Sequence, residues 1–389
     1  MQIASFLAAL PAVLGVSCNN LKESPMEPSA PAAQVQVSEI SPEGIARLMA
    51  SLPLDKDSAR EVWDAVSSSS DNGYDEEYTF RSLVSTPGAG VGDGIAGTKA
   101  REYPGALAGV LESYASARAM TRSGEDFMAA LRESGLQIYW PYSEDWDGES
   151  MPVLTFDPEN GSEKNIGFER ILLEDGTWKI KEITVDETVA KTRPVWVINR
   201  NRDEGFMTPR LMEKINGNNS SNRGTTRASS SVKTLKLKQF KAHRNYDSWL
   251  AGASEFFVKC GSVENFTART EDELKEYSPA ITDFMIVVKR KQVGTFLTLN
   301  VVLVSEWTEQ LQNCAFFIIE DDGGKQTTWK TNAEVKIKSK TYGFNIELPY
   351  NRNDDIVWRG SLSRSFLENY SGTANRYGDV SITFDIVSR

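Results

Sequence analysis

The sequence predicts a chain of two folded parts, an α+β part at residues 41–200 and an all-β sandwich at residues 233–389. Three observations lead to this prediction. Apolar residues recur at helical spacing as far as Gly135. From Gln137 onward they recur at the spacing of short strands. Residues 201–232, which are rich in Asn, Ser and Gly, have the composition of a polar linker between the two parts.

Helical hairpins are expected at the start of the α+β part. Ser41 is a suitable N-cap and Pro42 fits a first helical turn, so the first helix should begin there. The first two helices have apolar faces that repeat at i, i+3, i+4 and i+7. These faces consist of Ile45, Leu48, Met49 and Leu52, and of Ala59, Val62, Trp63 and Val66. Residues 67–73 should end the second helix, and similar spacing predicts two more helices, at 107–114 and 127–131.

A small, mostly antiparallel sheet should follow these helices. Short apolar runs predict strands at residues 137–140, 153–156, 168–173, 177–185 and 195–198. Asp175-Gly176 predicts a type I′ turn between two of these strands. Before the sheet, the acidic stretch 74–78 fails the register of an EF-hand calcium loop. We therefore expect a solvated acidic turn there, with Tyr74 and Tyr78 packed beneath it.

From Lys233 onward the pattern is mainly that of strands. Apolar runs or alternating residues occur at 235–237, 256–258, 284–288, 296–304, 316–319, 335–337, 344–348 and 380–386. About eight strands at this spacing predict a β-sandwich, with one short helical insertion at 271–276. Near-continuous apolar runs at 284–288, 296–304 and 316–319 predict central strands that are covered on both faces.

The start of the chain has the features of a secretion signal. Residues 3–16 form an apolar run that is too short to span a bilayer. Small residues then precede Cys18, an arrangement that resembles the lipobox of a bacterial lipoprotein. By this resemblance Cys18 is lipidated and becomes the first residue of the mature protein. No Lys or Arg precedes the apolar run, as a secretory signal normally requires, and a buried N-terminal helix is the alternative.

Residues 1–18 are therefore assigned to a lipoprotein signal peptide together with the cysteine that becomes lipidated, and residues 19–40 to a flexible tether. The tether is rich in Pro, Ala and Ser and has no apolar period. More than one acyl chain on the cysteine makes attachment to a membrane stable. No later stretch has eighteen consecutive apolar residues, so the lipid anchor is the expected contact with the membrane.

Composition and motifs argue against several classes of function. The 389-residue chain has a net charge of -11, whereas binding to nucleic acid needs clustered Lys and Arg. A single histidine, His243, leaves no multi-histidine zinc site. The sequence around Ser254 lacks the last glycine of the G-x-S-x-G motif that holds the nucleophile of many serine hydrolases, which argues against that class of enzyme. The glycine-rich stretch 88–97 lacks the helix that must follow a phosphate loop and is expected to be a mobile loop. No catalytic residues are assigned.

Two further cysteines, Cys260 and Cys314, lie near predicted strand ends. In an oxidising compartment they could form a disulfide, and two separate buried thiols are the other interpretation. The sequence alone does not place them within bridging distance.

The densest group of aromatic and acidic residues lies in the loop between the first two predicted strands. Its aromatic side chains are candidates for stacking on a ligand, and its carboxylates are candidates for binding a metal ion. The former are Trp140, Tyr142 and Trp146, and the latter are Asp145, Asp147 and Glu149. Three interpretations are open: a structural or recognition loop, a calcium site, and a pair of catalytic carboxylates that face a sugar.

Two further acidic groups follow predicted strands of the sandwich, which could place them at one rim. They are Glu320-Asp321-Asp322 and Asp354-Asp355, and their candidate metal ligands are Asp321, Asp322, Asp354 and Asp355. C2 domains bind calcium with carboxylates at such a rim, so a C2-like sandwich with a calcium site is one interpretation. Two ordinary turns with solvated charges are the alternative.

Several stretches resemble a family of uncharacterised lipoproteins of Bacteroidota-type bacteria. They are GYDEEYTF at 73–80, IYWPYSEDWDG at 138–148, PVLTFDP at 152–158, VDETVAKTRPVWVINRN at 185–201 and FFIIEDDGG at 316–324. The resemblance extends from about Glu39 to the C-terminus. It implies a location in the cell envelope and the two-part organisation, and it implies no activity and no catalytic residues.

We therefore expect a lipid-anchored protein of the bacterial cell envelope that acts as a binding or interaction module. The anchor would hold it to a membrane, at the periplasmic or surface face of the outer membrane. The alternative is a hydrolase of glycans or peptides that uses carboxylates of residues 140–149.

Overall fold

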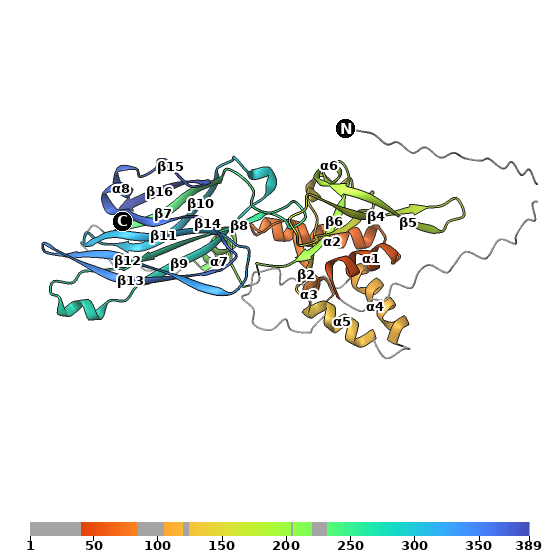
Figure 1. Cartoon of the computed structure of the whole chain (residues 1–389), viewed down its shortest axis with the longest axis horizontal. Coiled ribbons are helices and arrows are strands. Elements are labelled where there is room, and N and C mark those ends of the chain that lie inside the picture. Colours follow the sequence, from red (N-terminus) through yellow and green to blue (C-terminus); the bar gives the residue numbers. More distant parts are fainter. Residues whose placement is uncertain (1–39, 85–104, 120–123, 204, 220–231, 389) are drawn as a thin grey trace, which may run out of the picture. The chain divides into compact units, whose positions relative to one another are not determined.

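The computed structural model of this protein describes residues 40–84, 105–119, 124–203, 205–219 and 232–388 (Figure 1). The chain from Val37 onward forms one compact unit. Helices and a mixed sheet come first in this unit, and antiparallel sheets follow. The predicted fold class, an α+β part followed by a β-sandwich, is therefore confirmed. The boundaries proposed between the parts stay a prediction.

Three sequence predictions lie outside the described residues. They concern the signal peptide with Cys18, the tether at residues 19–40 apart from its last residue, and the glycine-rich stretch 88–97. Among the helices that the structure describes, none is long and apolar enough to cross a membrane.

The helices described in the first part are α1 (Pro42–Ser51), α2 (Lys56–Asp71), α3 (Phe80–Leu83), α4 (Ala106–Ala119), α5 (Gly124–Glu133) and α6 (Glu187–Ala190). Four of these helices, α1, α2, α4 and α5, match predicted helices, whereas the short helices α3 and α6 were not predicted. The N-cap prediction for α1 is confirmed, because Ser41 Oγ accepts a hydrogen bond from the Gly44 N–H at 3.1 Å. Helix α2 continues through the serine run that was expected to end it. Serine is tolerated there because Ser68 Oγ donates to the Ala65 carbonyl one turn earlier.

Six of the described strands form the sheet of the first part, in the order β1-β2-β6-β3-β4-β5. Their bounds are β1 Glu77–Thr79, β2 Leu136–Tyr139, β3 Val153–Phe156, β4 Lys164–Leu172, β5 Trp178–Asp186 and β6 Val195–Arg200. Strands β3 and β6 pair in parallel, and the other neighbours are antiparallel. Helix α1 packs on β3, β4 and β6, in the middle of this sheet.

Two predictions for this part are corrected. The β4–β5 connection is a longer loop than a type I′ turn, because the Leu173 N–H donates to the Thr177 carbonyl and only Gly176 has a positive φ there. The acidic stretch before the sheet is not a solvated turn. Tyr74 and Tyr78 are packed as expected, but the carboxylates between them are also buried, and Glu77 opens strand β1.

The second part is a sandwich of two antiparallel sheets. One has the order β10-β7-β16-β15, and the other has the order β13-β12-β11-β8-β9 with β14 also paired to β11. The strands are β7 Lys233–Ala242, β8 Ser254–Ser262, β9 Ala280–Val288, β10 Leu297–Trp307, β11 Leu311–Glu320, β12 Gln326–Ile337, β13 Lys340–Asn351, β14 Asp355–Ser363, β15 Ala374–Tyr377 and β16 Val380–Ser388. Short helices are η3 Asp272–Glu276, η4 Arg290–Gln292 and α8 Arg364–Asn369.

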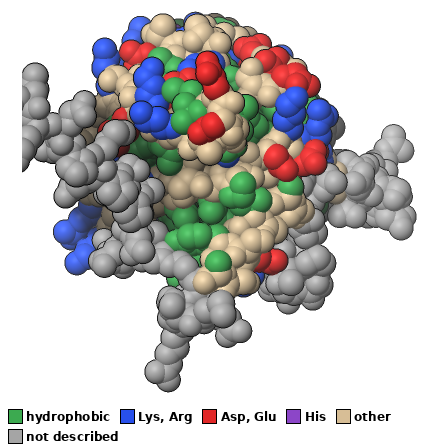
Figure 2. Space-filling view, turned by 90° about the vertical axis from the view of Figure 1, so that its right-hand side faces the viewer, with side chains coloured by type: hydrophobic (Ala, Val, Ile, Leu, Met, Phe, Trp, Pro, Cys, Tyr) green, Lys and Arg blue, Asp and Glu red, His purple; other side chains and the backbone are tan. Residues whose placement is uncertain are grey.

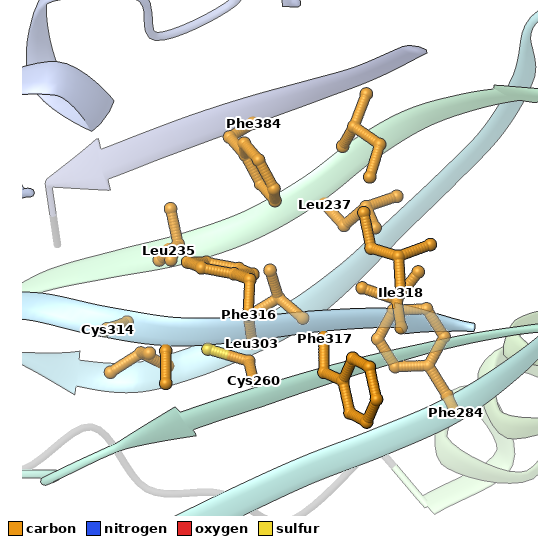
Figure 3. Close-up of a cluster of buried hydrophobic side chains, with 14 of the residues drawn as sticks. Leu235, Leu237, Cys260, Phe284, Leu303, Cys314, Phe316, Phe317, Ile318 and Phe384 are labelled. Atoms are coloured by element: carbon orange, nitrogen blue, oxygen red, sulfur yellow. The ribbon is translucent and has the colours of Figure 1, made fainter. Parts of the chain in front are cut away.

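The core of the sandwich lies between the two sheets (Figure 3). Leu237 of β7 and Phe384 of β16 face Phe316 of β11, and the rings of Phe316 and Phe384 are 5.0 Å apart. Cys260 and Cys314 are buried free thiols on adjacent strands of this core. The structure therefore agrees with the interpretation of Cys260 and Cys314 as two unpaired, buried thiols.

Three features of the second half differ from expectation. Strands β9 and β10 are edge strands and not central strands, and β10 alternates in exposure over its first half. Strands β14 and β15 lack a strong apolar pattern and were not predicted. Helix α7 (Pro209–Asn219) lies within the predicted linker. Its start repeats the pattern of α1, because Thr208 Oγ1 accepts from the Leu211 N–H at 3.2 Å and Pro209 follows the cap.

Candidate functional site

The loop between β2 and β3 docks a helix of the first part onto its sheet. Trp140 is fully buried, with its ring edge-on to Trp146 at 5.1 Å and to Trp196 at 5.6 Å. From α2, the Trp63 indole N–H donates to the Ser143 carbonyl at 2.8 Å. The aromatic residues of this loop therefore serve first to join helix and sheet.

A pocket of about 240 Å³ lies beside the same loop. It brings together five residues that the sequence singled out, namely Trp140, Tyr142, Asp145, Trp146 and Asp147. The opposite wall comes from residues 190–194, which follow α6. Glu149 does not line the pocket and forms an ion pair with Lys56 instead. Because Trp140 is fully buried, Tyr142 and Trp146 are the rings that a ligand can reach.

Asp147 is fixed by its own loop. Its carboxylate accepts hydrogen bonds from Ser150 Oγ at 2.6 Å and from the N–H groups of Ser150 and Glu149 at 2.8 and 2.9 Å. These bonds, the Ser150 hydroxyl first, lower the pKa of Asp147 to about 2. Asp147 is therefore an anion and a hydrogen-bond acceptor at any physiological pH.

Charged groups of both signs lie at the rim of the pocket. The Tyr142 hydroxyl donates to Glu187 Oε1 at 2.7 Å, and burial together with this carboxylate raises the pKa of Tyr142. Lys191 pairs with Glu187 at 3.2 Å and lies 5.8 Å from the centre of the Tyr142 ring. Arg193 pairs with Glu169 at 2.8 Å. The pocket thus combines aromatic faces with acceptors and donors of hydrogen bonds.

The two acidic groups of the sandwich meet at one edge. Asp354 accepts from the N–H groups of Asn351 and Asp322 at 2.7 and 3.2 Å, and Asp321 Oδ1 accepts from Asn351 Nδ2 at 3.1 Å. Burial raises the pKa of Asp354 to about 6. Asp355 is exposed. The carboxylates of Asp321 and Asp354 therefore hold two turns together.

A third acidic cluster was missed by sequence reasoning. Oxygen atoms of Asp247, Glu255 and Glu320 all lie within 4.8 Å of one another. The three residues come from the β7–β8 connection, the start of β8 and the end of β11. Glu320 belongs to an acidic stretch that the sequence singled out, but Asp247 and Glu255 lie far from it in the chain, so no local sequence pattern links the three residues.

The first part and the sandwich are joined by buried polar contacts close to this cluster. Asp75 Oδ2 accepts from the Ala253 N–H at 2.8 Å, and Glu76 pairs with both Lys289 and Lys291 at 3.2 Å. Burial first, and then the charge of Glu76, raises the pKa of Asp75 to about 6. The acidic stretch before the sheet is therefore part of the contact between the two parts.

His243 bonds to a serine other than the one in the imperfect nucleophile motif. Its Nε2 lies 2.8 Å from Ser381 Oγ on β16, while Ser254 Oγ accepts from the Tyr246 N–H at 2.9 Å. The Ser254 hydroxyl group is therefore already hydrogen-bonded to the backbone of the β7–β8 connection.

A larger pocket of about 380 Å³ lies where α7 meets the end of α2 and strands β9 and β10. Polar groups on its lining include Arg210, Glu213 and Lys289. It contains none of the residues that the sequence singled out.

An exposed apolar surface lies on the β4–β5 hairpin. Leu172 and Trp178 pair across the two strands and are 57% and 54% exposed, and Arg170 lies 4.6 Å from the Trp178 ring. Figure 2 looks onto the side of the molecule that is at the right in Figure 1, and it shows hydrophobic side chains gathered there among basic and acidic ones.

Comparisons with known proteins add little to this description. No protein-family model matches the chain, and no curated protein matches it. A solved structure described as Drosophila C2-DSL-EGF1 is similar at 10% identity, with a TM-score of 0.20, over 41% of this chain and 67% of that one. A likeness at this level supports no conclusion about function, and the C2-like form of the sandwich stays a prediction.

Proposed function

We propose that this is a lipid-anchored protein of the bacterial cell envelope whose folded part is a binding module for a saccharide. The observation that carries the proposal is the pocket beside Trp146, with its aromatic rings, fixed anions and flanking cations. Aromatic faces stack on the apolar face of a sugar ring, and carboxylates accept hydrogen bonds from its hydroxyl groups. At about 240 Å³ the pocket has room for one sugar unit.

The state of Asp147 favours binding over hydrolysis in this loop. A glycosidase needs one carboxyl that keeps a proton for the leaving group and a second carboxylate opposite it. Asp147, with a pKa of about 2, holds no proton to donate. Glu144 and Glu149 are engaged in ion pairs with Lys291 and Lys56. The hydrolase alternative therefore has weaker support than a binding site.

Binding is tested by saturation-transfer difference NMR of the full chain with glucose, galactose, xylose, N-acetylglucosamine and glucuronic acid. At least one sugar should show transfer that Asp145→Asn weakens and Trp146→Ala abolishes. Trp178→Ala is the matched control, because Trp178 is exposed in the same part but lies away from the pocket. Transfer that survives in Trp146→Ala, or its absence for all five sugars, would reject this ligand class.

The anchor is tested separately by fractionation of cells that express the full chain. Cys18→Ala should release the protein from the membrane fraction. Cys260→Ala is the control, because Cys260 is buried in the sandwich core and should leave the protein membrane-bound. Membrane retention of Cys18→Ala would refute lipidation.

A further inference from the structure

The fold itself brings three carboxylates to one end of the sandwich. Strands β8 and β11 are antiparallel neighbours, so Glu255 near the start of β8 lies beside Glu320 at the end of β11. The Asp321 N–H donates to the Glu255 carbonyl at 3.0 Å and fixes these two strand ends together. Asp247 reaches them from the β7–β8 connection, where its carbonyl accepts from Arg290 Nη1 at 3.0 Å.

Several oxygen atoms of this cluster have no N–H group or cation beside them. Glu320 is 0% exposed, and the side chain that its carboxyl group meets is the carboxyl group of Asp247. Asp247 Oδ2 is also buried without a partner. A buried carboxylate is strongly unfavourable as an anion unless hydrogen bonds or a cation compensate its charge. Two buried carboxyl groups thus face each other, and a cation held between them would compensate the charges of both.

Cationic side chains near the cluster do not fill this role. Arg202 Nη1 lies 4.0 Å from Asp247 Oδ1, and the Arg290 Nε is engaged with Glu187 at 3.0 Å. Further carboxylates add to the negative potential, among them Asp75, Glu77, Asp157, Asp203 and Asp322.

The donor atoms select the kind of cation. All three residues offer carboxylate oxygen, which suits calcium or magnesium and is a poor set for zinc or copper. Calcium lies about 2.3–2.6 Å from its ligands, so two ligands on opposite sides of it are separated by roughly 4.6–5.2 Å. Magnesium gives up its water ligands reluctantly and is seldom held by an all-protein cage, so calcium fits a set of protein carboxylates better. The three oxygens lie within 4.8 Å of one another, which is close enough for one calcium ion to contact all of them.

We propose that Asp247, Glu255 and Glu320 bind one calcium ion where the sandwich meets the α+β part. The ion would tie the β7–β8 connection to the ends of β8 and β11. The same connection carries Trp249 and Leu250, which are buried against Val153 and Val197 of the first part. Calcium would therefore strengthen the contact between the two parts, independently of the saccharide pocket.

The site is tested on the full chain after removal of metal with EDTA. Isothermal titration with calcium chloride at pH 7.5 should show one equivalent bound, and calcium should raise the melting temperature. Magnesium chloride should bind at least tenfold more weakly. No heat and no rise in melting temperature at 10 mM calcium would overturn the site, and equal affinity for magnesium would overturn the assignment to calcium.

Variants locate the ion. Glu320→Gln and Glu255→Gln should each weaken calcium binding at least tenfold while the protein stays folded, because each removes a buried negative charge. Glu347→Gln is the matched control on strand β13, where the side chain is 60% exposed and pairs with Lys330. Asp354→Asn tests whether calcium binds instead at the acidic edge of the sandwich that contains Asp321 and Asp354. Full calcium binding by Glu320→Gln, or its loss in Asp354→Asn alone, would overturn the proposed ligands.

Discussion

Replacement of Asp75 by asparagine tests the electrostatics of the contact between the two parts. Asp75 is 2% exposed, and its Oδ2 accepts from the Ala253 N–H. Burial raises its pKa from 3.8 to about 6. The folded protein therefore binds this proton more tightly than the unfolded chain does. The contribution of this proton to the free energy of unfolding is fully present below pH 3.8 and is lost as the pH rises through about 6.

The size of the effect follows from this shift. A difference of about two pKa units corresponds to on the order of 3 kcal/mol at pH 8. The asparagine side chain keeps an oxygen acceptor for Ala253 and carries no charge, but its amide N–H₂ group needs a partner, which costs about 1–2 kcal/mol if none is found. We therefore expect Asp75→Asn to raise the free energy of unfolding by about 1–2 kcal/mol at pH 8 and to give no gain at pH 5.

The assay is urea unfolding followed by tryptophan fluorescence, in EDTA, at pH 5 and pH 8. Asp272→Asn is the control, because the Asp272 side chain is 96% exposed and its removal should not change the pH dependence. Equal destabilisation of Asp75→Asn at both pH values would refute the reasoning, since it would mean that Lys289 stabilises an anionic Asp75 throughout.

Three further substitutions test the packing, each by urea unfolding. Trp63→Phe removes the donor to the Ser143 carbonyl and should lower the free energy of unfolding by about 1–2 kcal/mol; an unchanged value would mean that the loop does not hold α2. Gly252→Ala should cost about 1–3 kcal/mol, because φ is +125° at this position; a neutral result would contradict the described turn. Phe316→Ala should cost about 3–5 kcal/mol, and a loss below about 1 kcal/mol would contradict its place in the sandwich core.

Local patterns carried most of the fold prediction. Ser41-Pro42 marked the start of α1, and the apolar run at 316–319 marked β11, a strand that is buried along most of its length. Thr208-Pro209 carried the same signal for α7, but the polar composition around it concealed the helix. The hydrophobic period does not reveal strands β14 and β15, because they become strands through their pairing with β11 and β16.

A candidate site could be predicted only where its residues lie close together in the sequence. The aromatic and acidic residues of the loop are close in sequence, and five of them line one pocket, but the wall at 190–194 depends on the β5–β6 connection. The burial of Asp75 depends on Ala253, a residue far along the chain. The cluster of Asp247, Glu255 and Glu320 likewise exists only because β8 and β11 are neighbours.

The central claim is that the pocket beside Trp146 binds a saccharide. It is tested most directly by the tryptophan indole N–H signals in a two-dimensional ¹H–¹⁵N spectrum of the full chain, with Trp146 assigned through Trp146→Phe. Addition of the bound sugar should shift the Trp146 signal and leave the Trp178 signal in place. If the Trp146 signal stays fixed for every sugar in the panel, or if Trp178 shifts instead, the claim is contradicted.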